Sequence, residues 1–183
     1  GWRFGHGLMR ESLEARCRGS DRWAPAHRDC HDVLRAQPSP SCALTRRASQ
    51  HALEAGLWDE AAEAFYQSQQ DLRADDIQAH LERISEVLPL ESFPRARAFL
   101  YLSQAAMLLM QGKLEETEHT LTRCADLAQE HGLEDELEPK LLRSHINLAV
   151  HRFEPSHGLE LIAQLEPIEE PTPEMHVSRL RLH

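Results

Sequence analysis

Three side chains in the first third of the chain have the types and spacing that a zinc ion requires. His27, Cys30 and His31 stand at positions i, i+3 and i+4, so a helix would place them on one face. A zinc site needs further ligands or a catalytic glutamate, and no second His or Cys cluster with ligand spacing accompanies these three. Trp23 and Leu34 continue the same stripe. We therefore expect a packing surface here, and metal binding by His27, Cys30 and His31 is the weaker alternative.

The other sequences that imitate catalytic motifs are incomplete. The pair Gly112-Lys113 is followed by Leu-Glu-Glu, where a phosphate-binding loop would have a hydroxyl ligand for Mg²⁺. The tripeptide His27-Arg28-Asp29 imitates a kinase catalytic loop, but no Asn stands five residues after the Asp and no Asp-Phe-Gly follows. A Gly-x-Ser-x-Gly nucleophile elbow is absent as well. The sequence thus predicts no catalytic residues and no cofactor, and we do not expect this chain to be an enzyme.

Charge is distributed unevenly along the 183 residues. The formal net charge is −10, yet residues 1–50 carry nine Arg against five acidic residues, so the remainder is strongly acidic. Arg side chains can contact phosphates, but an acidic body opposes nucleic-acid binding, and DNA contact is a weaker alternative. The four cysteines follow no CxxC spacing, no apolar stretch reaches the ~20 residues of a membrane span, and no leader opens the chain. We expect a cytoplasmic protein with reduced thiols.

Hydrophobic periodicity predicts an all-α fold. Beyond residues 1–6 the 3.6-residue period recurs without a strand pattern, and Gly56, Gly112 and Gly132 stand where helices should end. The segment 95–111 is apolar on nearly every face, so it should be a central, buried helix, and 75–88 should pair with the helix before it. The predicted helices span about 8–17, 20–37, 43–55, 59–72, 75–88, 95–111, 114–131, 141–149, 159–165 and 175–182.

Two segments of the chain repeat one pattern without a gap. They are Gly56-Leu-Trp-Asp-Glu-Ala-Ala-Glu-Ala-Phe65 and Gly112-Lys-Leu-Glu-Glu-Thr-Glu-His-Thr-Leu121. In each, the Gly ends one helix, and the next helix has a large apolar residue, a small residue and another large apolar residue at matching positions. A small residue lets two helix backbones approach, and the large ones fill the space between them. The repeat therefore predicts helical hairpins built alike.

This pattern resembles the tetratricopeptide repeat. The likeness is good over residues 43–72, fair over 95–131 and weak over 135–165, where Phe153-Glu-Pro occupies the turn and no Gly precedes it. It implies an irregular TPR-like array of helical hairpins, an α-α superhelix, over residues 41–183, with the last hairpin truncated. An ordinary helical bundle that contains two similar hairpins is the alternative.

A second resemblance lies upstream, in Phe4-Gly-His6, in the helical segment that follows it and in Ala26-His27-Arg-Asp-Cys30-His31. It is to the region after the nucleotide-binding domain of bacterial STAND-type signalling ATPases, some of them linked to a Ser/Thr kinase. In those proteins a winged-helix segment and a linker helix precede a tetratricopeptide array. The resemblance implies that residues 1–40 are the end of such a segment plus its linker, and that the chain is a fragment of a larger protein.

The expected function is recognition of a protein or peptide, without bond cleavage. In tetratricopeptide arrays the first helices of the hairpins line the face that holds the partner, which in this chain points to Arg46, Gln50 and Glu54. These three side chains share a helix with Ala48 and Ala52 and point away from them. The competing interpretation is an intramolecular sensor that keeps the parent ATPase or kinase inactive; a metal-binding or DNA-contacting domain is weaker still.

Overall fold

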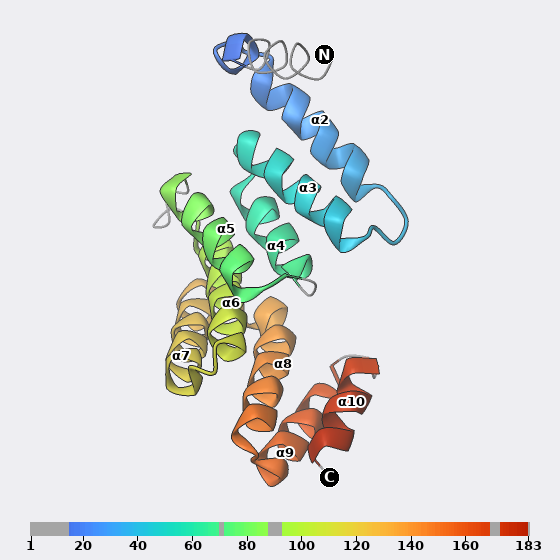
Figure 1. Ribbon diagram of the computed structural model, residues 1–183, viewed down its shortest axis with the longest axis vertical. Helices are drawn as coiled ribbons and strands as arrows, with labels where there is room; N and C mark the ends of the chain where they lie inside the picture. The colour runs from blue at the N-terminus through green and yellow to red at the C-terminus, as the bar shows by residue number, and fades with distance from the viewer. Residues whose placement is uncertain (1–14, 70–71, 88–92, 169–172, 183) are drawn as a thin grey trace, which may run out of the picture. The chain divides into compact units, whose positions relative to one another are not determined.

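The structure is a computed structural model that describes residues 15–69, 72–87, 93–168 and 173–182 (Figure 1). Within these ranges the chain forms helices and turns and no strand, which confirms the all-α prediction. The strand expected in residues 1–6 and most of the helix expected from Leu8 lie outside the described residues. None of the described helices combines the length and the apolar character that crossing a bilayer demands.

The chain divides into two compact units, Gly1–Ser68 and Gln69–His183. The two units meet after Ser68, whereas the resemblance to STAND-type ATPases implies a boundary after residue 40. The boundary after residue 40 stays a prediction. The first unit contains α2 (Trp23–Arg35), α3 (Cys42–Glu54) and α4 (Trp58–Gln67). The second contains α5 (Ala74–Val87), α6 (Pro94–Met110), α7 (Leu114–His131), α8 (Glu134–Arg152), α9 (Pro155–Leu165) and α10 (Pro173–Leu182).

In the first unit α3 packs between α2 and α4. Small side chains allow the close approach of α3 to α4, because Ala52 and Ala61 are fully buried at this contact. The Ser49 hydroxyl donates a hydrogen bond of 2.7 Å to the backbone oxygen of Ala61, so the two helices are also joined by a buried polar contact. Phe65 fills the remaining space and is completely buried. Figure 1 shows α3 and α4 side by side, joined by a short turn.

The second unit is organised around α6, which packs against α5, α7 and α8. Phe99, Leu102 and Leu108 are buried on different sides of α6, so the prediction of a central helix is confirmed. Farther along, α8 packs on α7 and α9, and α10 packs on both α8 and α9. The helix at 74–87, expected to pair with the helix before it, instead packs on α6 within this unit.

The same type of turn follows α3, α6, α7 and α8. At Gly56, Gly112, Gly132 and Phe153 the described chain takes a left-handed backbone conformation, with φ between 58° and 73°. After each of these residues the next N–H reaches back to a carbonyl five residues earlier, which is the Schellman arrangement that ends a helix. These bonds are Leu57 to Ala52 at 2.9 Å, Lys113 to Leu108 at 3.0 Å, Leu133 to Ala128 at 2.9 Å and Glu154 to Ala149 at 3.0 Å. The turn without a glycine thus has the same geometry as the others.

The two segments that repeat in sequence also match in burial. The repeat has four matched positions: one large apolar residue, a small residue, a second large apolar residue and a second small residue. In both hairpins the side chain at the first of these positions is half-buried, and the side chains at the other three are buried. The matched pairs are Trp58 and Leu114, Ala61 and Thr117, Phe65 and Leu121, and Ser68 and Cys124. The α3–α4 and α6–α7 hairpins therefore present the same register to their cores.

Helix α8 begins earlier than the hydrophobic pattern predicts. The periodicity indicates a start near Leu141, whereas the helix runs from Glu134 and contains Pro139 in its second turn. Glu134 and its two acidic neighbours stabilise this first turn through the helix dipole, so a segment without an apolar stripe is helical. Pro139 is buried and lacks only the N–H that would bond to the turn before it.

Candidate partner-binding face and the α2–α3 contact

The structure gives the three side chains predicted to bind a partner different surroundings. All lie on α3, and Gln50 is exposed. Arg46 donates a hydrogen bond of 2.7 Å from Nη1 to the backbone oxygen of Ser68, which follows the last turn of α4. Glu54 accepts a hydrogen bond of 3.1 Å at Oε2 from the indole Nε1 of Trp23. Arg46 and Glu54 therefore hold parts of the first unit together, while Gln50 faces solvent.

His27, Cys30 and His31 do not converge on one point. His31 is buried and its Nδ1 lies 3.0 Å from the backbone oxygen of Ala48, whereas Cys30 is exposed. His27 is half-buried and turns toward α3. In the ranges that the structure describes, no group of three or more His, Cys, Asp or Glu side chains has an arrangement that could hold a metal ion. His27 and His31 contact α3, as the packing interpretation predicts, whereas Cys30 is exposed and does not belong to the packing surface.

A cluster of aromatic and imidazole rings joins α2 to α3; we call Trp23, His27, His31, His51 and Glu54 the histidine cluster. The ring centroids of Trp23 and His27 are 4.2 Å apart, and those of His27 and His51 are 4.8 Å apart. The Nδ1 atoms of His27 and His51 approach to 3.1 Å, a hydrogen-bond distance. Polar rings thus supply much of the contact between these two helices.

Burial lowers the pKa of His51, and its neighbours on α2 add to this effect. The positive charge of a protonated His27 or His31 disfavours a proton on His51, whereas the carboxylate of Glu54 partly opposes the shift. The folded chain therefore favours the neutral form of His51.

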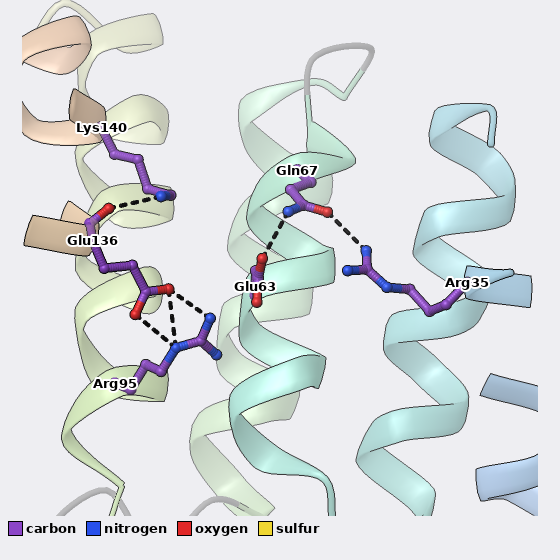
Figure 2. Close-up of polar contacts among 6 residues, drawn as sticks. All are labelled: Arg35, Glu63, Gln67, Arg95, Glu136 and Lys140. Carbon is purple, nitrogen blue, oxygen red and sulfur yellow. Dashed lines mark hydrogen bonds and ion pairs between the residues drawn. The ribbon is translucent and has the colours of Figure 1, made fainter. Parts of the chain in front are cut away.

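A second polar cluster joins the first turns of α6 and α8 in the other unit. Figure 2 shows Arg95 holding Glu136 with its guanidinium group, at distances of 2.6 to 3.0 Å. The Nζ of Lys140 donates to the backbone oxygen of Glu136 at 2.8 Å, and both cations lie over the ring of Phe99. The hydrogen bond from Arg95 holds the pKa of the Glu136 carboxyl below its usual value. This cluster ties together the first helices of two successive hairpins.

Figure 2 also shows a chain of polar contacts at the outer edge of the first unit. Arg35 of α2 donates from Nη1 to Oε1 of Gln67 at 2.9 Å, and the amide nitrogen of Gln67 donates to Oε1 of Glu63 at 2.9 Å. Arg35 and Gln67 are exposed, so this link contributes little stability. The attachment of α2 thus depends mainly on the histidine cluster.

Sequence reasoning missed His51 and the Arg95–Glu136 pair. The sequence gives no sign that His51 lies near His27. The two are 24 residues apart in the chain, and they meet only when α2 docks on α3. The ion pair was missed because the predicted helix began near Leu141, so Glu136 lay before it, whereas in the structure Arg95 and Glu136 stand in the first turns of α6 and α8.

Comparison of the chain with protein-family models, with curated proteins and with solved structures gave no match.

Proposed function

We propose that this chain is a non-catalytic, tetratricopeptide-like module that binds a protein or peptide within a larger signalling ATPase or kinase. The observation that carries the proposal is the match between the α3–α4 and α6–α7 hairpins. The two share the same turn and the same order of half-buried and buried positions in their second helices. Repeated hairpins of this kind are a common scaffold for peptide recognition, because their first helices form one continuous surface.

The arrangement of helices in the second unit supports such a surface. The first helices of successive hairpins contact one another, α6 with α8 and α8 with α10. In the first unit, α3 is the corresponding helix, and Gln50 is its exposed member of the three predicted residues. Because Arg46 and Glu54 make contacts within their unit, changing them would disturb folding as well as binding. Gln50 is the residue through which recognition can be tested cleanly.

The test is capture of binding proteins from a lysate of the source cells, with the whole chain as bait, at low and at high salt, followed by mass spectrometry. The variant is Gln50→Arg, and the matched control is Gln129→Arg, an exposed glutamine on the second helix of the α6–α7 hairpin. We expect Gln50→Arg to weaken capture of the partner and Gln129→Arg to leave it unchanged. Both variants should retain the helicity and melting temperature of the wild type.

Equal capture by both variants would remove α3 from the recognition surface. Capture of no partner at any salt concentration would contradict the proposal and favour the intramolecular regulator. That alternative has its own assay: the isolated module is added to the truncated parent protein, and inhibition of nucleotide hydrolysis is measured.

A further inference from the structure

The contact between α2 and α3 differs from the other helix contacts of the first unit in its chemistry. The buried side chains of α3 and α4 are mostly aliphatic or aromatic, with Thr45 and Ser49 as the polar ones among those described. On α2 the buried side chain is His31, while Trp23, His27 and Leu34 are half-buried. Helix α2 itself therefore contributes little aliphatic surface to its contact with α3, and its imidazole rings supply contacts that aliphatic side chains supply elsewhere.

Two of these rings form a contact that only some protonation states allow. The Nδ1 atoms of His27 and His51 are 3.1 Å apart, so one nitrogen must carry a hydrogen and the other must offer its lone pair. If both rings are imidazolium ions, two N–H groups and two positive charges face each other at this distance. The contact can therefore hold one proton between the two nitrogens but not two.

The groups around the pair do not remove this conflict. From α2, the third imidazole, His31, donates to the Ala48 carbonyl and adds no negative charge. From α3, Glu54 is the nearby carboxylate, and it already accepts the Trp23 indole hydrogen. On the other side of Trp23 lies the guanidinium of Arg18, 5.4 Å from the ring centroid, which is a further positive charge. The charges that shift the pKa of His51 are those of His27 and His31 on α2 and of Glu54 on α3.

We propose that the His27–His51 contact makes the docking of α2 sensitive to acid: when both rings are imidazolium ions, two N–H groups and two positive charges face each other 3.1 Å apart, and α2 separates from α3. Separation relieves the repulsion between the two rings and exposes the surface of α3 that α2 covers. This surface includes the Ala48 carbonyl and the ring of His51. The α3–α4 hairpin stays folded, because its core contains no histidine among the described buried residues. This response of α2 to acid does not depend on which partner the module binds.

The size of the effect follows from proton linkage. If the docked state takes up one proton fewer than the separated state, and the separated imidazole has its ordinary pKa of about 6.5, the opening equilibrium constant rises about eightfold from pH 7.0 to pH 5.5. A change of this size is large enough for hydrogen exchange to resolve.

The experiment is amide hydrogen exchange read by mass spectrometry on the whole chain at pH 7.0 and pH 5.5, with EDTA present so that no bound metal contributes. Rates are corrected with those of the unfolded chain at each pH. Peptides from α2 are compared with peptides from α4. The variants are His51→Gln and His27→Gln, whose amides can hydrogen bond without becoming charged, and the control is His119→Gln at an exposed position on α7.

In the wild type and in His119→Gln we expect α2 to lose protection about eightfold at pH 5.5, while α4 keeps its protection. In both cluster variants the loss should disappear. If one cluster variant does not fold, the other still removes the same contact from the opposite helix. The proposal would be overturned if α2 of the wild type kept its protection at pH 5.5. It would also be overturned if α2 lost as much protection in His51→Gln and His27→Gln as in the wild type.

Discussion

The turn between α8 and α9 allows a sharp test of the hairpin geometry. Phe153 has φ of 58° there, although its side chain carries a Cβ and a ring that is 89% exposed. The equivalent position after α6 is Gly112, with φ of 73°. A left-handed conformation strains every residue that has a Cβ, and glycine avoids this strain. We therefore predict that Phe153→Gly stabilises the protein.

The expected gain is about 0.5 kcal/mol. Relief of the left-handed conformation contributes roughly 1–2 kcal/mol. Glycine gives back roughly 0.5–1 kcal/mol because the unfolded chain gains freedom. Loss of the phenyl ring costs only about 0.3 kcal/mol, since most of the ring already lies in water. The reverse change, Gly112→Ala, should cost about 0.5–1 kcal/mol, and it does so without a clash because no atom lies within 4 Å of the added Cβ.

The assay is urea unfolding followed by far-ultraviolet circular dichroism, with Phe153→Ala as the control that removes the ring and keeps the strain. Phe153→Gly should be more stable than Phe153→Ala by about 0.5–1 kcal/mol, at an unchanged dependence on urea concentration. Equal stability of these two variants, or a less stable glycine variant, would refute the argument that backbone strain sets the energy of this turn.

Three further predictions concern the second unit. Glu136→Gln should destabilise it by about 1 kcal/mol in urea unfolding at pH 7, because the charged bond to Arg95 is lost. Arg95 lowers the pKa of Glu136, so this difference should be present above about pH 4.5 and fade as the pH falls further. Burial lowers the pKa of His145, so stability should fall from pH 7 to pH 5 as the unfolded chain binds the proton, and His145→Gln should flatten that slope. Burial raises the pKa of Cys124 to about 12, so in the folded chain at pH 8 iodoacetamide should modify exposed Cys30 and spare Cys124 by mass spectrometry.

Each of these three has a contradicting result. An equal effect of Glu136→Gln at pH 7 and at pH 3 would show that the charge of the carboxylate contributes nothing. A wild-type stability that does not change between pH 5 and pH 7 would place His145 in solvent. Alkylation of Cys124 as fast as Cys30 would mean that α7 opens readily in the native protein.

The sequence predicts the local parts of this fold well because they depend on short-range chemistry. Gly56 and Gly112 mark helix ends through a backbone conformation that glycine adopts freely, and Phe65 and Leu121 mark buried positions through their spacing from those turns. Each buried residue lies nine residues after its glycine, and the structure confirms both the turns and the burial. The buried nature of α6 was equally evident from its composition.

The features that the sequence did not predict depend on competing or long-range contacts. The start of α8 was missed because Pro139 and the acidic residues before it interrupt the apolar pattern, although charge and helix dipole stabilise that turn. The turn at Phe153-Glu-Pro was expected, but its likeness to the glycine turns was not, because Phe153 stands where a glycine was sought. At the candidate face, the hydrogen bond of Arg46 depends on where α4 ends and that of Glu54 on where α2 docks, and no local pattern encodes either.

The burial of α6 on several sides also has a consequence for synthesis of the chain on the ribosome. Contacts within a hairpin join segments close in sequence, so each hairpin can form soon after its second helix emerges. Helix α6 also needs a helix of the next hairpin, because α8, which covers one of its sides, is translated after α7. Until Arg152 has left the exit tunnel, the apolar surface that α6 will bury against α8 stays in water. We therefore expect chaperones to bind α6 during translation.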